Sequence, residues 1–203
     1  ETINCNTGRY NVGGCGVTTA ALLFGGRNPA GTDITESFNG SAWTEVADLN
    51  TARRALRGCG TQTAGLVCAG ATVAITEEYD GNSWTESGDL GTARYAGASA
   101  GTQTAGLYAG GFDDPGTCIT ASEEYNGTSW TEGDNLNNSR EGLAGAGSQT
   151  AGLIFGVSGH TEEYNGSSWA EQNNLNTSRY GTAGFGSQTA ALCGGGGPPT
   201  TAA

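Results

Sequence analysis

The sequence has no lysine, no methionine and one histidine among its 203 residues, so all eight basic residues are arginine. The formal net charge is −12, and the arginines form no long basic run. Contact with phosphates requires clustered positive charge. We therefore expect no nucleic-acid partner, and we attribute the acidity to solubility.

Long apolar runs are also missing, and the hydrophobic fraction is only 35%. Spanning a bilayer takes about 20 consecutive apolar residues, so we expect no membrane insertion. A low apolar fraction favours a thin core divided among small sheets over one large core. The chain opens at Glu1 and not at Met, which we interpret as a processed chain or a segment of a longer one.

The sequence contains few residues that could bind a metal or carry out catalysis. The only histidine is His160, and none of the six cysteines forms a C-x-x-C pair. A zinc site is therefore disfavoured, and a Ser/His/Asp triad would have to use that one histidine. An even cysteine count in a Ser/Thr/Gly-rich chain favours an oxidising, extracellular setting, with 15 alternative pairings open. We expect no metal, no cofactor and no enzymatic activity.

What the chain does contain is a repeat. Each tryptophan is followed ten residues later by an arginine, and each of these arginines is followed seven residues later by a glycine. The tryptophans are 41, 46 and 39 residues apart, which is the period of a repeat array. The members are Trp43, Trp84, Trp130 and Trp169, with Arg53, Arg94, Arg140 and Arg179.

Each unit predicts four short strands and almost no helix, because no segment keeps a 3.6-residue period. A Gly/Ala-rich strand precedes an apolar strand, then a strand ending in an aromatic residue, an Asn-Gly or Asp-Gly turn and the strand with Trp. Such dipeptides are typical of two-residue type I′ hairpins. Four strands in about 40 residues indicate one propeller blade. The small side chains of the first strand place it nearest the axis.

We therefore predict an all-β fold, a β-propeller of four-stranded antiparallel blades forming one domain over residues 1–203. It has four full repeats and a split fifth blade, closed where the two ends of the chain meet. The repeats are 9–52, 53–93, 94–139 and 140–178, with 179–203 and 1–8 sharing the fifth.

The Gly-Gly ending the second strand, the aromatic before the turn, the Trp after it and the Arg opening the next unit together resemble the Kelch repeat. The wording GTQTAGL…EEYNGTSWTE also looks like repeat proteins of environmental phages and viruses, in tail-fibre-like or particle-surface proteins. These resemblances imply a structural, surface-displayed subunit of a virion or an extracellular filament. Its partners would be itself or other particle subunits. The alternative is a lectin-like adhesion module that binds surface glycans.

Repetition decides how we interpret the shared residues. The arginines could form an anion-binding ring, and the tryptophans could stack on sugars. Sites are usually local, however, so occurrence in every unit favours scaffold roles. We expect the arginines to pair with repeated glutamates such as Glu77 or Glu123, and the tryptophans to pack between sheets.

Binding usually depends on variable loops carried by a regular scaffold. The loops after the second strands vary, and they share one face with the blade-to-blade connections. The candidate ligand-binding residues on that face are Arg27, Asp113, Asp114 and His160. Plain solvated loops are the alternative. Asp113 and Asp114 could also bind calcium, although the spacing of an EF-hand is missing.

Five N-x-S/T motifs are candidate glycosylation sites, three of them in the predicted hairpin turns. They are Asn39, Asn126, Asn137, Asn165 and Asn176. Because Ser and Thr are common in turns, chance matches are the alternative explanation.

Overall fold

The computed structural model describes residues 4–114 and 116–197, which form β-strands and one 3₁₀ helix, η1 (Val157–Gly159). The prediction of an all-β chain with almost no helix is confirmed. The strands are β1 (Gly13–Val17), β2 (Ala20–Phe24), β3 (Thr35–Phe38), β4 (Trp43–Glu45), β5 (Arg57–Thr61), β6 (Ala64–Cys68), β7 (Thr76–Tyr79), β8 (Trp84–Glu86), β9 (Arg94–Tyr95), β10 (Ala98–Thr102), β11 (Ala105–Ala109), β12 (Phe112–Asp113), β13 (Ser122–Tyr125), β14 (Trp130–Glu132), β15 (Ala144–Ser148), β16 (Ala151–Phe155), β17 (Thr161–Tyr164), β18 (Trp169–Gln172), β19 (Tyr180–Ser187) and β20 (Ala190–Gly197).

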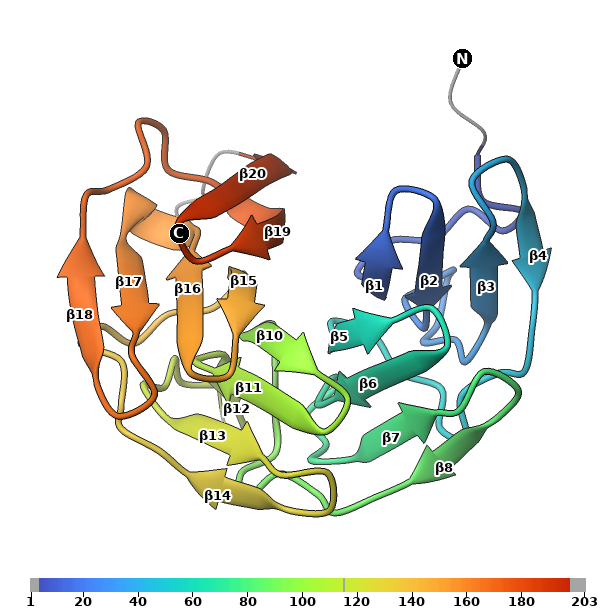
Figure 1. Cartoon of the computed structure of the whole chain (residues 1–203), viewed down its shortest axis with the longest axis horizontal. Coiled ribbons are helices and arrows are strands. Elements are labelled where there is room, and N and C mark those ends of the chain that lie inside the picture. Colours follow the sequence, from blue (N-terminus) through green and yellow to red (C-terminus); the bar gives the residue numbers. More distant parts are fainter. Residues whose placement is uncertain (1–3, 115, 198–203) are drawn as a thin grey trace.

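Four antiparallel sheets have four strands each, in the orders β1-β2-β3-β4, β5-β6-β7-β8, β10-β11-β13-β14 and β15-β16-β17-β18. We call them blades 1 to 4. Strands β19 and β20 pair as a last hairpin, and β9 pairs with β12 beside blade 3. The blades fan around a common centre in a propeller-like arrangement (Figure 1). Strands β1, β5, β10, β15 and β19 lie innermost and contact one another in that order, so the predicted position of the first strand is confirmed.

Small residues allow this convergence. Adding a Cβ to Gly145 would place it 2.3 Å from the carbonyl oxygen of Ser99 on the neighbouring first strand. Farther out, leucines of the second strand pack on glycines of the next blade. Leu66 contacts Gly106, and Leu107 contacts Gly152. The alternation of small and apolar residues therefore sets the spacing between blades.

A chain of backbone hydrogen bonds links the blades before their first strands. The N–H groups of Ala55, Ala96, Gly142 and Gly181 donate to the carbonyls of Asn11, Ala55, Ala96 and Gly142, at 2.8, 2.9, 2.7 and 3.1 Å. All five residues are left-handed, with φ from 54° to 69°. Ala55 and Ala96 adopt this conformation despite its cost for a residue with a Cβ. Each connection between blades thus contains a left-handed residue at the same place, which is a non-glycine residue at Asn11, Ala55 and Ala96.

The predicted type I′ turns are wrong. That turn needs positive φ at both central residues, but in the first turn Gly40 has φ 92° while Asn39 is not in the left-handed region. Asn39 N–H donates to Ala42 O, and its Oδ1 accepts from the N–H groups of Ser41 and Ala42 at 2.9 Å. A four-residue loop held by the Asn side chain replaces the two-residue turn. Asp80, Asn126 and Asn165 do the same in the other blades.

The two ends of the array differ from its middle. Asn6 N–H donates to Glu36 Oε2 at 2.6 Å, and Asn6 Nδ2 donates to Trp43 O, so residues 4–8 lie against blade 1 as a blade-to-blade connection does. They contain no strand, and β20 pairs only with β19 within the described residues. Completion of a fifth blade by the two ends stays a prediction, since residues 1–3 and 198–203 lie outside the described part.

Candidate functional site

The repeated arginines are buried in ion pairs with the third strand of the next blade. Arg53 Nη1 lies 2.9 Å from Glu77 Oε1, and Arg94 Nη2 lies 3.0 Å from Glu123 Oε1, without hydrogen-bond alignment. Arg140 Nη2 donates to Glu162 Oε1 at 2.6 Å. These side chains are at most 6% exposed. The prediction of pairing inside the stack is confirmed for these three arginines, while Arg179 is exposed and donates to Gly195 O, with no carboxylate partner within the described residues.

The same arrangement begins at the first blade, where Arg9 pairs with Glu36. Burial alone would raise the pKa of Glu36, but hydrogen bonds from the Asn6 N–H, the Arg9 guanidinium and the Thr7 N–H lower it overall. Burial lowers the pKa of Arg53 and Arg140, while their partner carboxylates oppose this change. The ion pairs are thus part of the contact between each connection and the following sheet.

The tryptophans also serve the contact between blades. The indole N–H groups of Trp84, Trp130 and Trp169 donate to the hydroxyls of Thr35, Thr76 and Ser122 on the preceding blade, at 3.2, 2.9 and 3.3 Å. Each indole lies about 5 Å from a tyrosine ring of its own blade: Tyr79, Tyr125 or Tyr164. The predicted packing role is therefore confirmed, and no indole lines the axis.

Glutamines at the tips of the first hairpins complete the contact. Gln103 Nε2 donates to Tyr79 O at 2.8 Å, and Gln149 Nε2 donates to Tyr125 O at 2.7 Å, both on the preceding blade. Gln62 and Gln188 make equivalent bonds. The repeated polar residues are thus occupied by the scaffold, and a specific site has to be sought where the repeat is broken.

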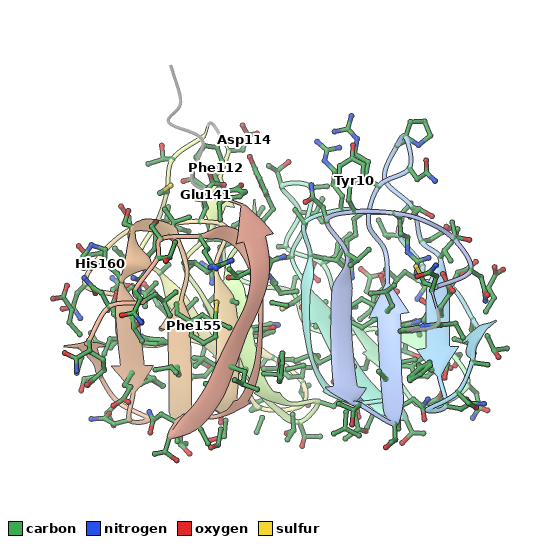
Figure 2. All side chains as sticks on the ribbon, turned by 90° about the horizontal axis from the view of Figure 1, so that it is seen from above. Tyr10, Phe112, Asp114, Glu141, Phe155 and His160 are labelled. Carbon is green, nitrogen blue, oxygen red and sulfur yellow. The ribbon has the colours of Figure 1, made fainter. Side chains whose placement is uncertain are left out.

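The four candidate loop residues are not brought together. Arg27 lies in blade 1, where Nε donates to Pro29 O at 2.7 Å and the guanidinium carbon is 6.0 Å from the Tyr10 ring centroid. Asp113 accepts from Thr117 N–H at 2.8 Å, and Asp114 is exposed beside it. His160 follows η1 at the outer side of blade 4, away from Asp114 and Tyr10 (Figure 2).

Among residues 4–114 and 116–197, no three His, Cys, Asp or Glu side chains gather in a group that could hold a metal ion. The Asp113 carboxylate binds its own loop backbone, through Thr117. The calcium alternative therefore gains no support from the geometry.

A cavity of about 740 Å³ follows the axis and opens between blade 1 and the last hairpin. Most of its lining is Gly, Ala and small polar residues of the innermost strands. Val17 and Phe185 flank it and are 65% and 55% exposed. A concave surface of this size is a default position for a ligand.

Arg57 lines this cavity and breaks the repeat. The equivalent residues in the other units are Gly13, Ala98, Ala144 and Ala183. Its guanidinium donates to Gly97 O at 2.8 Å, to Leu143 O at 3.2 Å and to Leu56 O at 3.0 Å. These bonds join blades 2, 3 and 4 across the centre. Burial lowers the pKa of Arg57, and within the described residues no carboxylate pairs with it.

A rim of polar and aromatic side chains surrounds the variable-loop end of the axis. It is formed by the residue after each repeated arginine: Tyr10, Arg54, Tyr95, Glu141 and Tyr180. Tyr10 and Tyr180 are 55% and 40% exposed. Tyr10, Glu141, Phe112 and Asp114 lie on the same face of the molecule (Figure 2). Tyrosine is enriched at binding surfaces because it joins an apolar ring to a hydrogen-bonding hydroxyl.

Contacts between rim residues give the face a defined shape. Tyr180 Oη lies 3.4 Å from Glu141 Oε2, and burial raises the pKa of Glu141. The rings of Tyr95 and Phe112 meet edge to face at 5.5 Å. A second cavity of about 220 Å³ lies between Arg54 and Tyr95. The rim and Arg57 were missed in the sequence, although the break at Arg57 in an otherwise Gly/Ala position was a visible signal.

All six cysteines lie in the described part of the chain, and all are free thiols. Cys59 and Cys68 are buried in the stack, where burial raises their pKa, to about 12 for Cys68. A raised pKa disfavours the thiolate, which is the reactive form. The thiols act as small apolar side chains in this fold, and no pairing is formed.

The glycosylation candidates differ in their surroundings. Asn39, Asn126 and Asn165 lie in exposed hairpin loops, and Asn176 is exposed in the connection to the last hairpin. The Asn137 Nδ2, the atom that would carry a glycan, donates to Glu162 Oε2 at 2.9 Å and to Trp169 O. A glycan on Asn137 would therefore break a contact between blades.

The fold and site define the class as a repeat-built all-β protein with a propeller-like arrangement. The chain matches no protein-family model, and no curated protein sequence matches it. Within the described residues, no helix is long and apolar enough to cross a bilayer.

Proposed function

We propose that this protein is a structural, non-enzymatic propeller subunit displayed on a virion, in the manner of a tail fibre, or in an extracellular filament. In this proposal its blades are Kelch-like and number five when the last one is completed. Self-assembly or binding to other particle subunits is its main interaction. Its place is outside the cell or on the particle surface.

The observation that carries this proposal is the use made of the repeated side chains. Arginine, tryptophan and glutamine in successive units each bind the neighbouring unit, as with Arg140 to Glu162, Trp169 to Ser122 and Gln149 to Tyr125. The use of the same side chains for contacts between successive units supports a role in forming a regular shape. Nearest-neighbour contacts of this kind are also what stabilises repeat proteins.

Electron microscopy of native particles or filaments, with an antibody against residues 1–203, tests the proposal. We expect label at regular intervals along the particle or filament. Label that is confined to soluble, monomeric material would contradict the structural role. A preimmune antibody serves as the control.

A lectin-like adhesion module is the second candidate, supported by the exposed tyrosines of the rim. Tyr10 and Tyr180 are 55% and 40% exposed, and each comes two residues before a residue that lines the cavity of about 740 Å³, Val12 or Thr182. A glycan array tests this function, with Tyr10→Ala and alteration of residues 112–117 as the variants. Loss of a hit in these variants, but not in Thr189→Ala at the opposite tip, supports adhesion. An array without hits contradicts it.

A further inference from the structure

The loop after the second strand starts with the same backbone contact in blades 1, 2 and 3. In each blade, one loop residue pairs through its backbone with the residue that follows a repeated arginine. The three pairs are Tyr10 with Arg27, Arg54 with Ala71 and Tyr95 with Phe112. These pairs occupy equivalent places in the repeat, so their side chains can be compared directly.

In blades 1 and 3 the two side chains of the pair are in contact. The guanidinium carbon of Arg27 lies 6.0 Å from the ring centroid of Tyr10. The rings of Tyr95 and Phe112 meet edge to face at 5.5 Å. A large side chain from the loop therefore covers the paired residue in both blades.

Blade 2 has no such cover, because Ala71 carries only a methyl group. Its partner Arg54 is exposed and forms no ion pair with a carboxylate of the described residues. The cavity of about 220 Å³ lies at this place, lined by Arg54, Ala55, Ala71, Thr72 and Tyr95. Space thus takes the position that a side chain occupies in blades 1 and 3.

The loop that forms one wall of this cavity has a strained backbone. Ala69, Ala71 and Thr72 are left-handed, with φ of 63°, 49° and 62°. Arg27 and Phe112, which are equivalent to Ala71, do not adopt this conformation. Positive φ at a β-branched residue is a genuine outlier, and strain of this kind is concentrated at ligand-binding places. The wall is therefore held in a shape that its own residues do not prefer.

The charges around the cavity favour an anion beside one wall. Arg54 is the only charged residue among the five that line it. Burial and the carboxylate of Glu141 raise the pKa of Tyr95, while Arg54 opposes this rise. Glu141 is engaged by the hydroxyl of Tyr180, at 3.4 Å. The cavity therefore has a cation without a counter-ion on one wall and a tyrosine ring on the other.

These two walls match one kind of ligand. A guanidinium group binds a carboxylate through two parallel hydrogen bonds. A tyrosine ring offers an apolar face for the C–H groups of a sugar ring, and its hydroxyl can bond to a sugar hydroxyl. Sites for drug-sized ligands measure about 300–1,000 Å³, so a cavity of about 220 Å³ suits a single ring better than an extended peptide.

We propose that the cavity between Arg54 and Tyr95 binds a sugar ring that carries a carboxylate, as a uronic acid does. The carboxylate lies on Arg54 and the ring packs against Tyr95. Phe112, which contacts Tyr95, lies on the face that carries the variable loops (Figure 2). The inference rests on the adhesion function given above as the second candidate, and it names the ligand class for that function.

The test is an NMR titration of the full chain 1–203 with methyl β-D-glucuronide. The neutral control is methyl β-D-glucoside, which has the same ring with a hydroxymethyl group in place of the carboxylate. We expect saturable shifts of the amide signals of Arg54, Ala71, Thr72 and Tyr95 with the glucuronide. The glucoside should bind about tenfold more weakly, as expected for the loss of a charge-assisted hydrogen bond.

Variants of the protein identify the two walls. Arg54→Gln should weaken glucuronide binding about tenfold and leave glucoside binding unchanged. Ala71→Phe introduces the side chain that blade 3 has at this place and should abolish binding of both sugars. Arg27→Gln is the matched control and should change neither affinity. Arg54 is exposed, so Arg54→Gln decides the test even if Ala71→Phe does not fold.

Three results would overturn the proposal. The first is equal affinity for the glucuronide and the glucoside, and the second is equal affinity for acetate and the glucuronide. The third is binding of the glucuronide that is unaffected by Arg54→Gln. Tighter binding of an aspartate-containing peptide, lost in Arg54→Gln, would replace the sugar with an acidic peptide as the ligand.

The glycan array separates this site from the adhesion function on which it rests. Hits confined to neutral glycans would support adhesion and overturn the proposed site. An array without any hits would contradict adhesion and, with it, this site. Imaging of particles tests the structural role independently of both.

Discussion

The phenol of Tyr125 on blade 3 donates a hydrogen bond to Glu78 Oε1 on blade 2, and the two oxygens lie 2.5 Å apart. Burial and this carboxylate raise the pKa of Tyr125 to about 12. The bond needs a protonated phenol. One contact between blades thus makes the stack sensitive to alkali.

The sign of the alkaline effect follows from the raised pKa. The phenol ionises near 10 in the unfolded chain and near 12 in the folded protein, so its contribution is complete below pH 10 and is lost as the pH rises to 12. We expect the free energy of unfolding to fall across this window. Tyr125→Phe should flatten the fall, measured by urea unfolding at each pH. An unchanged profile in Tyr125→Phe would contradict this account.

Arg140→Ala should destabilise the protein by about 3–5 kcal/mol, because it leaves the buried carboxylate of Glu162 without its counter-ion. Arg179→Ala is the matched control, since Arg179 is exposed and has no carboxylate partner within the described residues. Its cost should stay within about 0.5 kcal/mol. Unfolding in guanidinium chloride measures the loss of stability in both variants. An equal loss in the two variants would show that the ion pair with Glu162 is not the cause of the destabilisation.

Trp84→Phe removes an indole N–H that donates to the hydroxyl of Thr35, which is fully buried. Leaving that hydroxyl unpaired should cost about 1–3 kcal/mol beyond the loss of ring size. Trp43→Phe controls for ring size, because the Trp43 indole makes no such bond within the described residues. The test is the difference in the free energy of unfolding between the two variants. A difference near zero would show that the indole–hydroxyl hydrogen bond does not stabilise the fold.

Ala96→Gly should stabilise the protein by about 0.5–1 kcal/mol. Ala96 has φ 56°, and a left-handed alanine costs about 1–2 kcal/mol relative to its preferred regions, part of which glycine's larger unfolded-state entropy offsets. Ala100→Gly, within strand β10, should destabilise by a similar amount. Thermal unfolding of the two variants should shift in opposite directions. A shift in the same direction would contradict strain at Ala96.

Glu36→Gln tests the first ion pair by its pH dependence. Because Arg9 and the backbone lower the pKa of Glu36 below 4.5, its contribution is present above that value and is lost as the pH falls through the lowered pKa. We expect Glu36→Gln to be less stable at neutral pH and less sensitive to acid. Acid unfolding of variant and parent is followed by tryptophan fluorescence. The same dependence of stability on pH in both proteins would contradict this prediction.

The candidate site was less predictable than the scaffold. Asp113 and His160 were chosen because they lie in variable loops, and the structure places them in different blades. Arg57 and the rim tyrosines lie around the axis, yet Arg57 is 47 positions from Tyr10 and 123 positions from Tyr180 in the sequence. Proximity of that kind depends on how blades are arranged, which a linear pattern does not contain.

The sequence by itself determined the strands, their grouping in fours and the structural role of Arg53 and Trp84. A side chain that recurs in every unit points to a contact that recurs between every pair of neighbouring units. The tertiary structure alone decided the loops of Asn39 and its equivalents, the left-handed turn at Ala96 and the position of the Arg57 cation at the axis. These features depend on how closely neighbouring sheets approach each other and on how strongly the array curves. The approach and the curvature are set by packing between units, and not by the order of residues within a single unit.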